Sequence, residues 1–264
     1  MKYNTGLVPS PPDSRDYIYK AIVQPVTQKV PEECTTWMQY ISPVKYQGDL
    51  GACVCFASTA AVEIFNSKEY GAPFDLSEQF LYDEAKKIDG VEEEGTYFRA
   101  AFSVLRHKGV CEEVYQPYEA IYPPINKLEN GGLKNAEKYK IVSYASVEAD
   151  VESLKRAIYQ TGPVLVGIHV WDSFVKTPES GIVAMPTGKR QGAHALALVG
   201  YTKDYFIAKN SWSPYWGKEG YCYISWDVWN AITLDEAWSI VDSIQGKRCF
   251  LIRLFNKLIG RGGR

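Results

Sequence analysis

The stretch from residue 54 to residue 65 constrains the fold most, because nearly all of its side chains are small or apolar. A helix that is apolar on every face belongs in a protein interior. The preceding loop contains Gly48 and Gly51, which allow tight turns, and Cys53 falls in the first turn of the predicted helix. The free amides and the positive dipole end at a helix start favour thiolate over thiol. We therefore predict a buried helix that begins at a reactive cysteine.

A histidine and an asparagine lie in two apolar runs of strand length farther along the chain. His194 opens the first run, and Asn210 lies near the end of the second. Residues 202–204 between them are typical of a turn, so we expect an antiparallel hairpin that brings both side chains to one end. Free cysteine is often simply a core residue, and this is the alternative for Cys53. A cysteine, a histidine and an orienting amide, however, are the parts of an activated thiol nucleophile.

These segments resemble the papain-like cysteine peptidases. In that family the histidine and the asparagine follow the nucleophile by roughly 130–150 residues. His194 falls inside this interval and Asn210 slightly beyond it, as a loop insertion would produce. Gln47 lies where the family has its oxyanion-hole glutamine, and residues 210–212 match the family's Asn-Ser-Trp. The resemblance covers about residues 42 to 241.

The resemblance implies an α+β fold of two lobes with an active-site cleft between them. The first lobe would be helical and contain the buried nucleophile helix, and the second would be an antiparallel, β-barrel-like lobe. We expect a proline-rich N-terminal segment (1–32), a mainly helical lobe (33–120), a mainly β lobe (121–241) and a basic C-terminal extension (242–264).

The N-terminal segment (1–32) shows no pattern typical of a helix or a strand. Residues 11–17 resemble the leader of prokaryotic- and viral-type members of the family, which lack the long helical pro-domain. The segment contains several prolines and no helical period, so we expect it to be extended. Either it covers the cleft and is displaced or removed for activation, or it is a strap that packs on the second lobe.

The resemblance implies a cysteine endopeptidase. Cys53 would attack the scissile carbonyl as a thiolate, paired with a His194 imidazolium that Asn210 orients. The Gln47 side chain and the Cys53 backbone amide would hold the oxyanion on the way to an acyl-enzyme. Cys55 is not the expected nucleophile, because it lies about 200° round the helix from Cys53. No cofactor or metal is implied, and the six cysteines show no paired zinc spacing.

The resemblance also assigns substrate-binding positions. Gly95 and Thr96 would lend backbone groups to an extended peptide, and Tyr97 and Phe98 would wall the main specificity pocket unless they pack in the core. Small residues at pocket positions in the second lobe would leave room for a large apolar or aromatic side chain. The assigned residues of that lobe are Gly167, Ala193, Ala195 and Trp212.

Three positions depart from the family pattern. Val54 replaces a tryptophan, Leu50 replaces a disulfide cysteine, and Ser213 replaces a glycine. None of these removes a catalytic group, although Leu50 removes the disulfide. The alternatives are a non-catalytic binding or regulatory module with the same fold, and a specialised processing or isopeptide hydrolase with the same chemistry.

Local patterns predict further elements. Ser77 is expected to cap a helix that has Ile88 on its inner face and ends at Gly90. A second amphipathic helix is expected over residues 146–159. His169, in the apolar strand that follows, is expected to be a strand histidine with its hydrogen bonds satisfied.

Composition limits the other classes of function. The formal net charge is −2, which gives no reason to expect nucleic acid. No apolar run approaches a membrane span, and the N-terminus lacks the apolar core of a secretory signal. Because Leu50 stands where the family disulfide would begin, free thiols in an intracellular reducing compartment are the better expectation. Peptides or proteins are the expected substrates, and the basic tail (242–264) either contacts a partner or a membrane surface or ends as a packed element.

Overall fold

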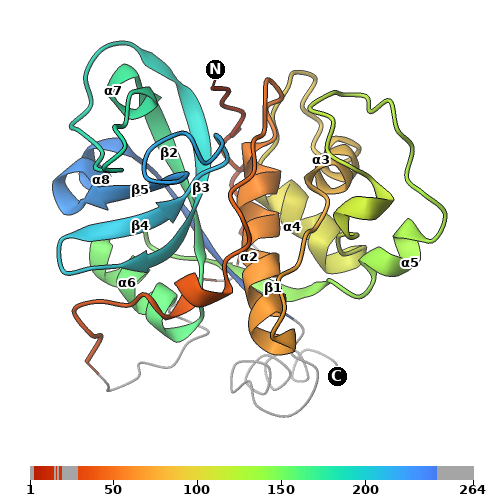
Figure 1. The fold of residues 1–264 in the computed structure, drawn as a ribbon, viewed down its shortest axis with the longest axis horizontal. Helices are drawn as coiled ribbons and strands as arrows, with labels where there is room; N and C mark the ends of the chain where they lie inside the picture. The colour runs from red at the N-terminus through yellow and green to blue at the C-terminus, as the bar shows by residue number, and fades with distance from the viewer. Residues whose placement is uncertain (1–2, 15, 17, 20–28, 243–264) are drawn as a thin grey trace.

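The computed structural model describes residues 3–14, 16, 18–19 and 29–242. Figure 1 shows an α+β architecture in which several helices lie on one side, and a sheet flanked by further helices lies on the other. The predicted basic extension lies outside the described residues except for its first position.

Residues 53–136 form the helical side, and residues 141–242 form most of the sheet side (Figure 1). In chain order the first half contains η1 (Thr36–Tyr40), α2 (Cys53–Tyr70), α3 (Glu78–Lys86), α4 (Phe98–His107), η2 (Glu113–Tyr115) and α5 (Gly132–Ala136). The second half contains β1 (Ile141–Ser146), α6 (Val151–Gln160), β2 (Val164–Trp171), α7 (Asp172–Val175), β3 (Arg190–Tyr201), β4 (Tyr205–Lys209), β5 (Tyr221–Ser225), α8 (Trp226–Ile232) and β6 (Thr233–Asp242). None of the helices described is long and apolar enough to cross a membrane.

Helix α2 runs along the boundary between the two sides (Figure 1). Every side chain from Cys53 to Ile64 is buried, as the apolar sequence predicts. The helix ends where Gly71 adopts a left-handed conformation with φ of 70°, and the Gly71 N–H donates to Ser67 O at 2.9 Å. A single buried element thus carries Cys53 at its first position.

Helix α3 begins as predicted and ends earlier. The Ser77 hydroxyl accepts a hydrogen bond from Phe80 N at 3.0 Å, which satisfies an amide of the first turn. Ile88, expected on the inner face, lies beyond the last helical residue and is 51% exposed. The inward prediction was wrong because the helix stops before the apolar period reaches that position.

The helix predicted over residues 146–159 begins later than expected. Residues 141–146 form β1, which pairs with β6, so Ser146 ends a strand. Asp150 then caps α6 by accepting from Ser153 N at 2.9 Å. The acidic cap therefore sets the start of this helix.

The strands form one six-stranded sheet in the order β1-β6-β2-β3-β4-β5, and every neighbouring pair is antiparallel. Strand β3 pairs with β2 on one side and with β4 on the other. The β3–β4 hairpin turns at the predicted residues 202–204, and Ala197 lies opposite Lys209. Asn210, just after β4, is therefore brought to the part of β3 that carries His194.

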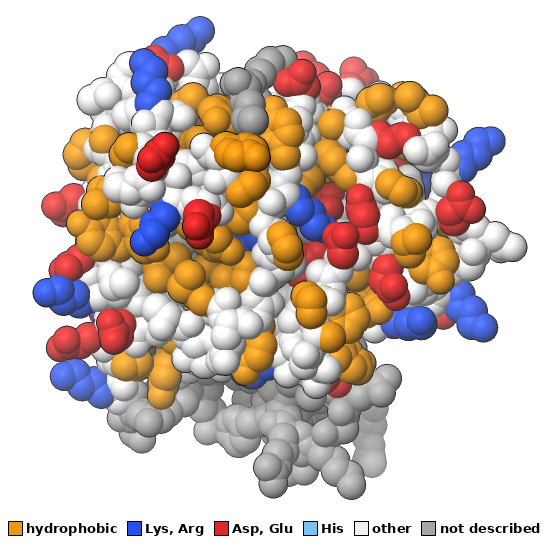
Figure 2. Space-filling view, in the orientation of Figure 1, with side chains coloured by type: hydrophobic (Ala, Val, Ile, Leu, Met, Phe, Trp, Pro, Cys, Tyr) orange, Lys and Arg blue, Asp and Glu red, His pale blue; other side chains and the backbone are white. Residues whose placement is uncertain are grey.

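The two sides meet where α2 packs against β3. Cys53 therefore comes from the helical side, and His194 comes from the sheet side. Over the face drawn in Figure 2, acidic and basic side chains are interspersed with apolar ones across both sides.

Candidate active site

Cys53 opens helix α2, and its side chain is completely buried. The loop before it turns at Gly48, whose φ is 63°, and Ala52 N donates to Leu50 O at 2.8 Å. Ala52 O in turn accepts from Cys55 N at 2.9 Å, which closes the first helical turn. The thiol therefore lies at the positive end of the 18-residue helix α2.

His194 and Asn210 are joined by a hydrogen bond. His194 Nε2 donates to Asn210 Oδ1 at 2.8 Å, and the same oxygen accepts from Ser211 N at 2.8 Å. The Trp212 ring lies against the imidazole, with centroids 4.5 Å apart and planes inclined by 30°. Among the described residues His194 Nδ1 has no hydrogen-bond partner. The ring is thus held through one nitrogen and has the other available for a proton.

The Cys53 thiol and the His194 imidazole are both shielded from water. Burial raises the pKa of Cys53 to about 12, although hydrogen bonds from the backbone of Ala195 and Gly6 act against the rise. Burial lowers the pKa of His194 to about 4, although its bond to Asn210 acts against the fall. In the described form, burial thus disfavours the charged state of both groups. The contact with Gly6 identifies the N-terminal segment as one source of this burial.

Residues 3–8, named here the covering strand, lie between the two sides at this point. Thr96 N donates to Gly6 O and Val8 N donates to Thr96 O, each at 3.0 Å, which pairs Leu7 with Thr96 in parallel. On the other side Gly6 N and Leu7 N both lie 3.2 Å from Ala193 O, which accepts from them. The covering strand thus forms hydrogen bonds with backbone groups of Thr96 and Ala193, two positions that the resemblance assigned to substrate binding.

Side chains of the covering strand occupy neighbouring positions. Tyr3 stacks on Trp212 with ring centroids 5.1 Å apart, and Trp212 Nε1 donates to Asn4 O at 3.0 Å. Leu7 is 5% exposed and points at Gly167, where an added Cβ would meet Leu7 Cδ2 at 2.7 Å. An apolar side chain therefore fills the space that the small residue at position 167 leaves.

The covering strand approaches the loops on either side of it very closely. A Cβ on Gly6 would lie 2.2 Å from Gly51 O, and a Cβ on Gly95 would lie 2.4 Å from Gly6 O. Contacts this short with backbone atoms cannot be relieved by rotating a side chain. Three glycines from three parts of the chain therefore permit the packing.

Gln47 is fully buried and connects the two sides. Its Nε2 donates to Leu50 O at 3.0 Å, and its Oε1 accepts from Ser211 Oγ at 2.6 Å. Its backbone N–H donates to Ser211 O at 2.9 Å. Since an amide nitrogen carries two hydrogens, one remains available on Nε2 for a ligand.

Other sequence-assigned residues lie in different settings. Phe98 is fully buried and stacks on Phe102 inside α4, with centroids 5.7 Å apart, so its described ring contact is in the core. Tyr97 is the half-buried residue before that helix. His169, opposite Ala193 in the sheet, has no described partner at Nδ1, so the expectation of a fully satisfied histidine was wrong.

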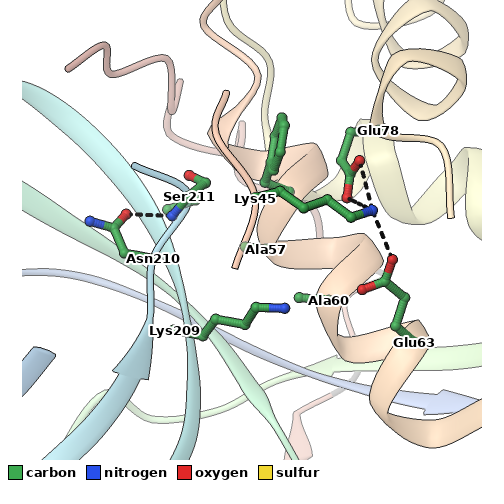
Figure 3. Close-up of a pocket in the computed structure, with 10 residues that line it drawn as sticks. Lys45, Ala57, Ala60, Glu63, Glu78, Lys209, Asn210 and Ser211 are labelled. Atoms are coloured by element: carbon green, nitrogen blue, oxygen red, sulfur yellow. Dashed lines mark hydrogen bonds and ion pairs between the residues drawn. The ribbon is translucent and has the colours of Figure 1, made fainter. Parts of the chain in front are cut away.

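A cluster of buried charges beneath the site was not foreseen from the sequence (Figure 3). Lys45 Nζ lies 3.0 Å from Glu63 Oε1 and 2.9 Å from Glu78 Oε1. Lys209 reaches toward it from β4, and its Nζ donates to Ser42 Oγ at 2.8 Å. Ser42 Oγ in turn donates to Glu63, which links the sheet side to α2. The sequence feature that could have indicated this cluster is Glu63, an acid within a helix run whose other residues are small or apolar.

Replacing Glu63 by alanine is expected to lower the free energy of unfolding by about 1–3 kcal/mol, because it leaves the buried Ser42 hydroxyl and Leu76 N–H without their acceptor, while Lys45 keeps Glu78. Urea unfolding followed by fluorescence measures this loss. Glu69→Ala, at an exposed position of the same helix, is the matched control and should change the value little. A loss below about 1 kcal/mol for Glu63→Ala would show that the cluster does not stabilise the junction of the two sides.

Comparisons with known proteins agree with this geometry. A family model described as papain family cysteine protease matches residues 30–241. A germination-specific cysteine protease of Arabidopsis thaliana is 35% identical, over 74% of this chain and 52% of its own length. An uncharacterized peptidase C1-like protein of Acanthamoeba polyphaga mimivirus is 28% identical, over 83% of this chain and 80% of its own. The chain thus spans most of the viral relative but about half of the plant one.

A solved structure is similar over nearly the whole fold. The crystal structure of xylellain, a cysteine protease from Xylella fastidiosa, superposes with a TM-score of 0.79 at 26% identity. The match covers 91% of this chain and 96% of that one.

Proposed function

The chain belongs to the papain family of cysteine proteases, and we propose that it is an endopeptidase whose nucleophile is Cys53. Its fold and its class, a papain-like cysteine peptidase, follow from the family match. The individual catalytic roles are part of the proposal. The observation that supports them most is the His194–Asn210 hydrogen bond, which leaves Nδ1 unpartnered on the strand whose backbone contacts the Cys53 thiol.

In the proposed reaction the Cys53 thiolate attacks the scissile carbonyl carbon. The Gln47 Nε2 hydrogen and the Cys53 backbone N–H donate to the oxyanion. His194 then protonates the leaving amine, which departs and leaves a thioester. His194 next takes a proton from water, whose oxygen attacks the thioester; the carboxylic acid leaves, and the Cys53 thiolate and the His194 imidazolium are restored. Asn210 keeps the imidazole oriented throughout.

We further propose that the described form is the closed state of the enzyme. The covering strand lies on Thr96 and Ala193, and its Gly6 contacts the nucleophile. A peptide could bind these backbone groups only after the strand has left them. The position of Leu7 beside Gly167 supports an apolar side chain as the preferred occupant of that pocket in a peptide or protein substrate.

An epoxysuccinyl peptide, which alkylates activated thiols, tests both proposals on the full chain. We expect slow labelling of Cys53 in the unchanged protein and faster labelling in Gly6→Ala. Overpacking costs about 1–3 kcal/mol, which corresponds to roughly a ten- to hundredfold rise in the labelling rate. Peptide mapping identifies the labelled cysteine.

The control for this experiment is Ser10→Ala, which leaves the close glycine contacts intact and should label like the unchanged protein. Equal labelling of Cys53 in Gly6→Ala and Ser10→Ala would rule out the closed-state proposal. Labelling without preference for Cys53 in every variant would instead favour the non-catalytic binding module. A labelled enzyme that cleaves only one protein junction would indicate the specialised processing hydrolase.

A further inference from the structure

Lys86, in the last turn of α3, carries a buried ammonium group. Its side chain is 3% exposed, and Nζ donates to three backbone carbonyls: Val91 O at 2.7 Å, Glu93 O at 2.9 Å and Gly95 O at 3.1 Å. The same nitrogen forms an ion pair with Asp89 Oδ2 at 3.1 Å, and that carboxylate is completely buried. Since lysine has only three N–H donors, all of its capacity is directed at one loop.

This loop, residues 89–95, leads directly into the backbone that holds the covering strand. Both backbone groups of Gly95 form hydrogen bonds. Its N–H donates to Tyr82 Oη at 3.2 Å, and its carbonyl accepts from Lys86 Nζ. Both side chains come from α3. The next residue, Thr96, donates and accepts the two hydrogen bonds that pair with Gly6 and Val8.

The loop has little else to hold it in place. It contains no helix or strand, and residues 92–94 are three consecutive exposed glutamates. Adjacent like charges repel one another, which favours an extended and variable loop. The Lys86 ammonium pairs with the Asp89 carboxylate and donates to three carbonyls of the loop, so it opposes the extension that this repulsion favours. Loss of these contacts would leave Tyr82 as the remaining described contact of Gly95 with α3.

We propose that Lys86 is a positioning residue that fixes Thr96 as the backbone edge for peptide binding. It acts through Gly95 and touches neither the nucleophile nor the bound chain. In the closed state this edge holds the covering strand. In the open state, an inference that rests on the proposed function, the same edge holds the backbone of an extended substrate.

The first test uses the full chain and a small reagent. Iodoacetamide alkylates Cys53 at a rate that depends on how often the covering strand leaves. Lys86→Met keeps the length of the side chain and removes its donors, so we expect alkylation of Cys53 about tenfold faster, as weakening the two backbone hydrogen bonds of Thr96 predicts. Lys87→Met, at the neighbouring 61% exposed lysine, should leave the rate unchanged. Lys86→Arg, which retains charge and donors, should restore most of the slow rate.

The second test measures turnover in chains that also carry Gly6→Ala. For an extended peptide substrate, Lys86→Met should raise KM about tenfold and leave kcat nearly unchanged. For an ester of one blocked amino acid, which has no backbone to pair with Thr96, kcat/KM should not change. A purely structural role would lower kcat/KM for both substrates by the same factor. Circular dichroism with thermal unfolding checks that each variant is folded.

The outcomes separate this proposal from the one on which it rests. An unchanged alkylation rate in folded Lys86→Met, or an equal loss of kcat/KM for the two substrates, would overturn the role of Lys86. Absence of turnover in Gly6→Ala itself would overturn the proposed function, while the alkylation rates would still decide whether Lys86 fixes the edge. Should Lys86→Met not fold, Lys86→Gln, which keeps two donors without the charge, is read in the same way.

Discussion

Replacing His194 by alanine is expected to lower kcat by roughly 10⁴- to 10⁶-fold, the scale seen when one member of a nucleophile–base pair is removed. The change removes both the proton acceptor that generates the thiolate and the donor to the leaving amine. It also removes the group through which Asn210 acts. Hydrolysis of a fluorogenic peptide by the full chain carrying Gly6→Ala measures the effect.

The control is His107→Ala, which changes an exposed histidine in α4 and should leave kcat unchanged. Iodoacetamide labelling provides a second readout, because without the imidazole Cys53 should react no faster than an ordinary thiol. If kcat falls less than tenfold in His194→Ala, another group is the base and the assignment of His194 is wrong.

Replacing Gln47 by alanine is expected to lower kcat by roughly 10²–10³-fold with little change in KM, as removal of one oxyanion donor does elsewhere. The available Nε2 hydrogen would stabilise charge that develops only in the transition state, so ground-state binding should not depend on it. Steady-state kinetics on the Gly6→Ala background measure kcat and KM separately.

The structure also gives Gln47 a bridging role that must be separated from catalysis. Its Oε1 accepts from Ser211 Oγ, so Ser211→Ala breaks this bond between the two sides while both Nε2 hydrogens remain. We expect Ser211→Ala to retain most of the activity. A loss as large as that of Gln47→Ala would indicate that the bridge, and not the oxyanion donor, carries the effect.

Local pattern was sufficient to predict α2 and the β3–β4 hairpin. A helix-length run in which nearly all side chains are small or apolar belongs in the interior, and two strand-length runs around a short turn pair with each other. The meeting of His194 and Asn210 at one end follows from that hairpin. Their roles in catalysis were inferred from a resemblance and remain predictions.

Contacts between distant backbones could not be predicted in this way. The approach of Gly6 to Gly51 and Gly95 has no period and no local turn signal, since it depends on how three separate loops meet. Proline content indicated only an extended N-terminal segment. The partners of Glu63 and the three carbonyls around Lys86 likewise become visible only in the folded chain.

In the proposed closed state, the covering strand also determines how Cys53 reacts with oxidants. Peroxide oxidises cysteine in its thiolate form, and susceptibility rises with exposure. Beneath the covering strand Cys53 is fully buried, and burial raises its pKa to about 12, so it offers neither charge nor access. In the proposed closed state we therefore expect Cys53 to remain reduced when peroxide is present. Only the opened enzyme risks irreversible sulfinic acid, so activation also limits how long each molecule can work.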